Sequence, residues 1–161
     1  MITEEKRIEK TCSFYASDYH LEMIMVPYIN KKMDEQAQIE IITEKSLEKT
    51  VKIVIKNVNL SKERKQKLLN LNWANNCTNN LKESSQKGNN SNNEQIIFVV
   101  GSMNYIDHIN QEIEKIASFS KTKIINCYSI EDMQKNATEI ATKHTKILNT
   151  KTEKELGKNY C

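Results

Sequence analysis

The sequence Gln95-Ile96-Ile97-Phe98-Val99-Val100-Gly101-Ser102 decides the fold that we expect. Its five consecutive apolar residues form a run of strand length, which the glycine and serine end with a turn. Residues 103–117 then carry isoleucine at positions 106, 109, 113 and 116, the spacing of one helix face. A buried strand followed directly by an amphipathic helix is typical of parallel sheets.

The same succession of an apolar run, a small polar residue and a helical stripe occurs elsewhere in the chain. We expect strands at residues 9–17, 37–43, 69–73, 95–100 and 121–128, and helices at residues 18–33, 46–58, 61–69, 103–117 and 129–147. This alternation predicts an α/β fold, a three-layer sandwich with a mainly parallel five-stranded sheet in a flavodoxin- or Rossmann-like arrangement. By analogy with flavodoxin-like sheets, the expected strand order is 2-1-3-4-5.

Three segments each have two interpretations. Pro27 lies inside a helical stripe and predicts a kinked helix, but residues 20–26 could instead form a strand before a helix that begins at Pro27. Residues 46–58 fit a helix or a strand, and Ser46 as a helix N-cap favours the helix. The apolar seam of residues 129–147 could cover the sheet or meet a partner helix, and it is too short to favour a coiled coil.

The length of 161 residues suits one α/β domain that spans residues 1–161. Residues 75–93 are rich in asparagine and carry one sizeable apolar side chain, so we expect a mobile loop there. Residues 149–161 are polar, and we expect a frayed tail.

The charge pattern says little about a partner. The net charge is only +3, which gives no global field to attract nucleic acid. Residues 52–67 and 141–161 are locally basic, but Tyr160 is their only aromatic residue that could stack on a base. We therefore interpret both segments as solvated lysine-rich surface and expect no nucleic-acid partner.

The cysteines and the chain termini indicate a reduced compartment. Cys12, Cys77, Cys127 and Cys161 are widely separated, with no C-x-x-C pair and no histidine at ligand spacing, so we expect no metal site. The charged N-terminus lacks an apolar segment of the signal-peptide kind, and no apolar run approaches the length of a membrane span. We expect a cytoplasmic protein without a membrane partner.

The predicted topology brings several loops to one edge of the sheet. Parallel strands place their carboxyl ends together, and each of these ends is followed by small polar residues at a helix start. The candidate ligand-binding residues are Ser17, Asp18, Gly101, Ser102, Asn104 and Ser129, and Thr43 and Ser46 lie on the same edge. Free helix amides and hydroxyl groups suit an anion, although ordinary helix capping explains the same residues.

No catalytic or nucleotide-binding motif accompanies these residues. The chain contains neither G-x-G-x-x-G nor G-x-x-x-x-G-K-[ST], so we expect no dinucleotide or P-loop triphosphate site, and it also lacks G-x-S-x-G and H-E-x-x-H. The cofactor, if there is one, is unknown from the sequence. The leading hypothesis is a regulatory or ligand-sensing module without catalysis that binds a small anion or polar metabolite. One alternative is an enzyme for a small phosphorylated or polar substrate, with Asp18 and His20 as proton-handling groups. Another is an interaction module that forms a homo-oligomer through the last helix.

Overall fold

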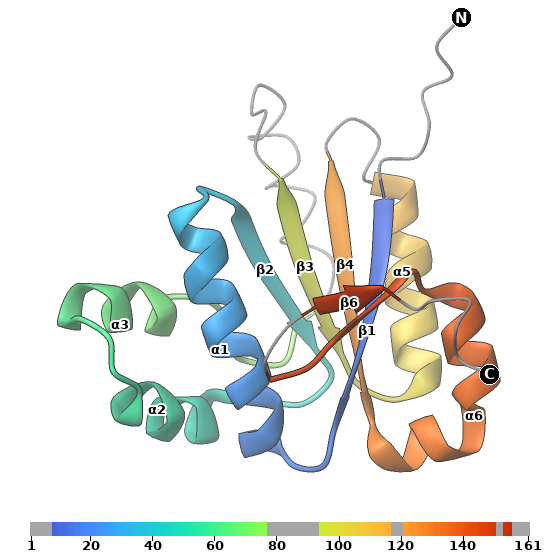
Figure 1. Ribbon diagram of the computed structural model, residues 1–161, viewed down its shortest axis with the longest axis horizontal. Coiled ribbons are helices and arrows are strands. Elements are labelled where there is room, and N and C mark those ends of the chain that lie inside the picture. The colour runs from blue at the N-terminus through green and yellow to red at the C-terminus, as the bar shows by residue number, and fades with distance from the viewer. Residues whose placement is uncertain (1–7, 77–93, 117–120, 151–152, 156–161) are drawn as a thin grey trace, which may run out of the picture.

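The central sheet has six strands in the part of the chain that the computed structural model describes, residues 8–76, 94–116, 121–150 and 153–155 (Figure 1). These strands are β1 (Ile8–Tyr15), β2 (Gln38–Thr43), β3 (Gln95–Val100), β4 (Thr122–Ser129), β5 (Lys146–Leu148) and β6 (Glu153–Glu155). Their order in the sheet is β2-β3-β4-β1-β5-β6. The first five run parallel, and β6 is antiparallel to β5.

Helices cover both faces of this sheet. They are α1 (Asp18–Asp34), α2 (Glu48–Asn57), α3 (Lys62–Leu69), α5 (Met103–Ile116) and α6 (Ile130–Lys143). The first three lie on one face, and α5 and α6 lie on the other (Figure 1). The predicted α/β class with a mostly parallel sheet between two helical layers is therefore confirmed.

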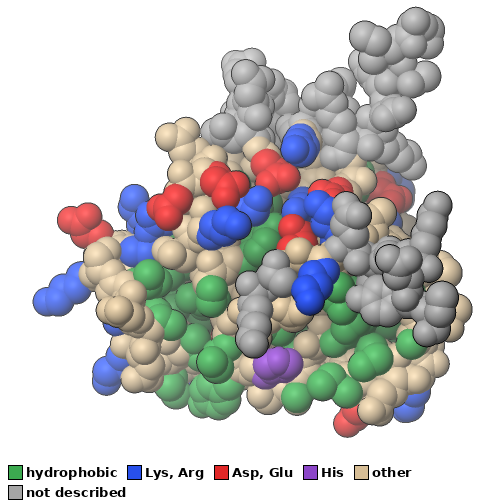
Figure 2. Space-filling view, viewed as in Figure 1, with side chains coloured by type: hydrophobic (Ala, Val, Ile, Leu, Met, Phe, Trp, Pro, Cys, Tyr) green, Lys and Arg blue, Asp and Glu red, His purple; other side chains and the backbone are tan. Residues whose placement is uncertain are grey.

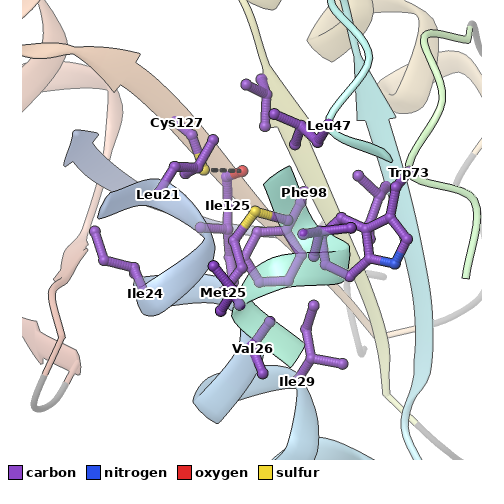
Figure 3. Close-up of a cluster of buried hydrophobic side chains, with 14 of the residues drawn as sticks. Leu21, Ile24, Met25, Val26, Ile29, Leu47, Trp73, Phe98, Ile125 and Cys127 are labelled. Atoms are coloured by element: carbon purple, nitrogen blue, oxygen red, sulfur yellow. Dashed lines mark hydrogen bonds between the residues drawn. The ribbon is translucent and has the colours of Figure 1, made fainter. Parts of the chain in front are cut away.

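The larger core lies between α1 and the sheet. Leu21, Met25 and Ile29 of α1 face Phe98 and Ile125 of the central strands (Figure 3), and all five side chains are buried. Burying each of them stabilises the fold by about 1.5–3 kcal/mol. The second core, on the opposite face, packs the isoleucine stripe of α5 and part of α6 against the sheet.

Two of the ambiguous segments prove to be helical. Pro27 lies inside α1 with its ring exposed, so the interpretation of residues 20–26 as a strand is wrong. Residues Glu48–Asn57 form α2, as favoured, but its N-cap residue is Leu47 and not Ser46. The Ser46 hydroxyl still accepts a hydrogen bond from the Glu48 amide at 3.3 Å.

The expected strand order is wrong. β1 lies between β4 and β5, whereas the flavodoxin-like order requires β1 between the second and third strands. The expected third strand at residues 69–73 is also absent, because Leu69 ends α3 and the Trp73 indole donates a hydrogen bond to the Leu68 carbonyl at 2.8 Å. That contact folds the chain back against α3 instead of extending it.

The C-terminal region differs most from expectation. The last helix ends at Lys143, four residues before its predicted end, and residues 146–148 form β5 beside β1. The expected frayed tail is wrong for residues 153–155, which form β6, and residues 151–152 and 156–161 lie outside the described residues. The predicted covering role of this helix is confirmed, since Ile140 of α6 is buried in the second core.

A buried polar network lies at the end of α6. Nδ1 of His144, the residue after α6, lies 2.6 Å from the Ile140 carbonyl and must donate to it. Nε2 of His144 then accepts from the Asn126 amide at 2.9 Å. Asn126 of β4 and Asn110 of α5 exchange two further hydrogen bonds of 2.8 and 3.0 Å. The arrangement requires neutral His144, and burial lowers the pKa of this imidazole below 6.5.

A buried lysine forms an ion pair that holds the last strand, β6, against the sheet. Lys123 of β4 is 4% exposed, and its ammonium group lies 2.9 and 3.0 Å from the two carboxylate oxygens of Glu153 on β6. The Thr11 hydroxyl of β1 donates to the same carboxylate at 3.1 Å. These contacts hold β6 across the face of β1 (Figure 1).

Asn76 covers part of the open edge of β2. Its side-chain amide donates to the Ile41 carbonyl at 2.8 Å and accepts from the Thr43 amide at 3.0 Å, and its own backbone amide donates to the Thr43 carbonyl at 3.1 Å. The Tyr105 hydroxyl of α5 donates to the Asn76 carbonyl at 2.8 Å. Residues 77–93, most of the segment that the sequence predicts to be a mobile loop, lie outside the described residues.

Candidate functional site at the carboxyl edge of the sheet

The parallel pairing brings the predicted loops to one edge. Tyr15 is the register partner of Ser129, Val100 is the partner of Cys127, and Thr43 is the partner of Val100. The residues that follow β1, β2, β3 and β4 therefore lie along the same edge, the lower end of the sheet in Figure 1. Ser17, Ser102 and Ser129 share this edge.

The three serines cap the helices that begin there. The Ser17 hydroxyl accepts from the His20 amide and the Ser129 hydroxyl from the Asp132 amide, each at 3.1 Å. The Ser102 hydroxyl accepts from the Tyr105 amide at 3.3 Å. Each cap is worth about 1 kcal/mol of stability, so these hydroxyl groups have a structural role whether or not a ligand binds. Asn104 is exposed in the first turn of α5.

A carboxylate of the protein lies at the start of α5. The backbone amide of Ser102 donates to Oε1 of Glu44, the residue after β2, at 2.9 Å. A methyl group added at Gly101 would lie 2.9 Å from that oxygen and 2.6 Å from the Tyr105 ring, so only glycine leaves room for this approach. The positive end of the α5 dipole favours an anion at this position.

An ammonium group of the protein lies at the start of α1. Nζ of Lys45 is 2.5 Å from the Asp18 carboxylate and 5.1 Å from the centre of the Tyr15 ring. Burial opposes the charge of Lys45, but the hydrogen bond to Asp18 and the neighbouring Tyr15 outweigh it and raise the lysine pKa. Lys45 follows β2 and Asp18 follows β1, and β3 and β4 lie between these strands. The ion pair therefore crosses the carboxyl ends of β3 and β4.

Asp18 and His20 are engaged with different partners. The Asp18 carboxylate is paired with Lys45, and Nδ1 of His20 accepts a hydrogen bond from the Ala16 amide at 2.9 Å. That bond assigns the proton of the neutral imidazole to Nε2. The structure places both residues in the first turn of α1 but orients them to separate contacts.

Glu22 is the residue of this region that sequence reasoning missed. It lies one turn after Asp18 on α1 and has no exposed surface. The Thr50 hydroxyl of α2 donates to its Oε2, and its Oε1 has no hydrogen-bond partner among the described residues. Burial raises the pKa of this carboxyl group to about 7. The available signal was a glutamate among the apolar residues that surround it, between Leu21 and Met25.

Several apolar side chains are exposed on the face of the sheet that α1 to α3 cover. On the face of α1 to α3, hydrophobic side chains gather toward the carboxyl edge, and Lys, Asp and Glu gather toward the opposite edge (Figure 2). Tyr19 and Met23 of α1 and Ile53 of α2 are exposed large hydrophobic residues.

The described residues contain no cluster of three or more His, Cys, Asp or Glu side chains that could hold a metal ion. Within the same ranges, no helix combines the length and apolar composition needed to cross a bilayer. Comparison with family models, curated proteins and solved structures finds no match. The chemistry of the site must therefore be inferred from its own geometry.

Proposed function

We propose that the protein is a small cytoplasmic sensing module that binds a small anion or polar metabolite at the carboxyl edge of its sheet, without catalysis of its own. The observation that supports this proposal most directly is the contact of the Glu44 carboxylate with the Ser102 amide. The start of α5 accommodates a carboxylate beside Gly101, at the edge where flavodoxin- and Rossmann-like proteins bind their ligands.

The Glu44 carboxylate acts in this proposal as an internal competitor. Glu44 is exposed and lies in a bend after β2, so a soluble anion can replace it without opening the core. The displaced segment leads directly into α2, which contacts α1 through Thr50 and Glu22. Binding at the sheet edge would therefore change the packing of α2, and this change is the signal of the sensor.

Thermal-shift measurements on the wild-type chain and on Glu44→Ala test the proposal. The panel contains inorganic phosphate, acetate, citrate and nucleotides at constant ionic strength. Because the variant lacks the tethered competitor, we expect an anion to stabilise it at a concentration about tenfold lower than the wild type requires. The exposed α3 carboxylate supplies the matched control, Glu63→Ala, which should behave as wild type.

The Ser102 amide provides a second readout that does not depend on melting temperature. Its nitrogen and proton chemical shifts should move in Glu44→Ala and move again when the anion is added. If no anion shifts either the amide signal or the melting temperature of either protein, the proposed function is wrong.

A further inference from the structure

We propose that the ligand carries both a carboxylate and an ammonium group, held several ångströms apart, as in an ω-amino acid or a short peptide with free termini. This inference rests on the proposed function and specifies its ligand. Glu44 and Lys45 are consecutive residues, yet one places a carboxylate on the start of α5 and the other places an ammonium group on Asp18. The Glu44 carboxylate and the Lys45 ammonium group thus occupy, at the carboxyl edge of the sheet, the two positions that the charged ends of such a ligand would take.

The ammonium half of the site combines charge with an aromatic face. Asp18 supplies a carboxylate at 2.5 Å from the Lys45 nitrogen, and the Tyr15 ring lies under the same group at 5.1 Å. A carboxylate together with an aromatic face is suited to a cation. The Lys45 and Asp18 side chains are 46% and 32% exposed, so a soluble ammonium group can exchange with the lysine.

The buried carboxyl group of Glu22 lies next to the ammonium half along α1. Asp18 and Glu22 are four residues apart on α1 and lie on the same side of the helix. The charges of Asp18 and Lys45 both act on the Glu22 carboxyl group, while no side chain or backbone amide of the described ranges donates to its buried Oε1. A free ammonium group carries three N–H donors and lacks the tether of Lys45. Because the Glu22 oxygen has no exposed surface, such a group would donate to it only after Lys45 and the side chains around it move.

The strand order sets the separation of the two charges. Ser102 follows β3 and Asp18 follows β1, and β4 lies between these strands. Two interstrand spacings amount to about 10 Å. Side chains that lean toward each other make the distance between the two charged groups shorter than this. An α-amino acid is too short to span this gap, whereas a molecule such as 6-aminohexanoate can reach both positions.

Isothermal titration of the double variant Glu44→Ala/Lys45→Ala with a series of amino acids tests this inference. The series contains glycine, 4-aminobutyrate and 6-aminohexanoate, and hexanoate and hexylammonium are the controls with a single charge. We expect 6-aminohexanoate to bind about tenfold more tightly than either control and more tightly than glycine, because it gains a second charge-assisted contact. The wild-type chain should show the same ranking with weaker binding.

Matched variants identify the two halves of the site. Added to the double variant, Asp18→Asn should abolish the advantage of 6-aminohexanoate over hexanoate without weakening hexanoate itself, and Glu22→Gln should reduce that advantage. Lys62→Ala/Glu63→Ala removes an exposed consecutive pair of the same charges on α3 and should leave wild-type binding unchanged.

The outcomes separate this inference from the proposed function. If hexanoate binds as tightly as 6-aminohexanoate, the inference is overturned, and the anion site at the start of α5 stands. If the variants without Glu44 bind no anion at all, both proposals are overturned. Circular dichroism of each variant verifies that a loss of binding does not reflect unfolding.

Discussion

Glu22 of α1 and Thr50 of α2 are joined by a hydrogen bond across the interface of the two helices. The carboxyl group that accepts this bond has no exposed surface, and its second oxygen has no hydrogen-bond partner within the part of the chain that the structure describes. Burial raises its pKa to about 7, so it changes protonation near neutral pH. The contact between α1 and α2 therefore depends on a group that titrates in the range where cells operate.

Glu22→Gln should remove a pH dependence of stability. The folded chain keeps a proton on Glu22 up to about pH 7, whereas the unfolded chain releases it near pH 4.5, so stability from this group falls as pH rises between these values. The loss amounts to about 3 kcal/mol. Urea unfolding at pH 5 and pH 8 should show a gain for the variant that is larger by this amount at pH 8.

An exposed acid provides the control for that experiment. Glu63→Gln on α3 should leave the difference between the two pH values as in wild type. A Glu22→Gln variant with the same pH dependence as wild type would mean that the carboxyl group titrates normally.

Asn126→Ala should be one of the costly single substitutions in the second core. The side chain exchanges hydrogen bonds with Asn110 and donates to His144, so its removal leaves two buried polar groups without these partners. We expect a loss of about 3 kcal/mol in the free energy of unfolding, measured by urea denaturation. Asn104→Ala, at an exposed position of α5, should change stability by less than about 0.5 kcal/mol. Equal effects of the two substitutions would contradict the network.

The contribution of His144 to stability should decrease in acid, which is opposite in sign to the contribution of Glu22. Its pKa in the folded chain lies below 6.5, so under acidic conditions the unfolded chain binds a proton that the folded chain does not. The contribution of His144 to the free energy of unfolding is fully present above pH 6.5. It falls as the pH decreases toward the lowered pKa of His144 in the folded chain. In His144→Gln this dependence should disappear, while the exposed control His108→Gln should retain it. An NMR titration that finds His144 protonated at pH 6.5 in the folded chain would disprove this prediction.

The ion pair between Glu153 and Lys123 should show strong coupling in a double-mutant cycle. Glu153→Gln leaves the buried ammonium of Lys123 with a weaker partner, and Glu9, at 3.8 Å, does not replace the lost charge at hydrogen-bond distance. We expect this substitution to cost about 3 kcal/mol. The double variant with Lys123→Met should lose less free energy of unfolding than the sum of the two single variants. Additive losses would mean that the ion pair does not hold β6 in place.

The parts of the fold that the sequence predicted are those whose signal is local. Residues 96–100 form a continuous apolar run because β3 is buried on both faces, and the predicted strand bounds of 95–100 agree with the structure. β5 has only three residues and lies where the apolar seam of a helix was expected to continue. Its existence depends on the pairing with β1, more than 130 residues earlier, which no local pattern encodes.

The candidate site divides in the same way. Ser17 and Ser129 were predicted as helix caps because a cap contacts amides within three residues. The contact of Lys45 with Asp18 depends on the strand order and on the packing of α1 near α2, and neither could be derived from the sequence. Glu22 was missed for the same reason, since only the approach of α2 buries it.

Asn76 has a consequence for the behaviour of the protein at high concentration. An uncovered outer strand is a template on which other chains polymerise, and the carbonyl groups of Ile41 and Thr43 would otherwise offer such a template. One asparagine satisfies both of them and the Thr43 amide as well, so growth of an intermolecular β-ladder is blocked at this end of β2.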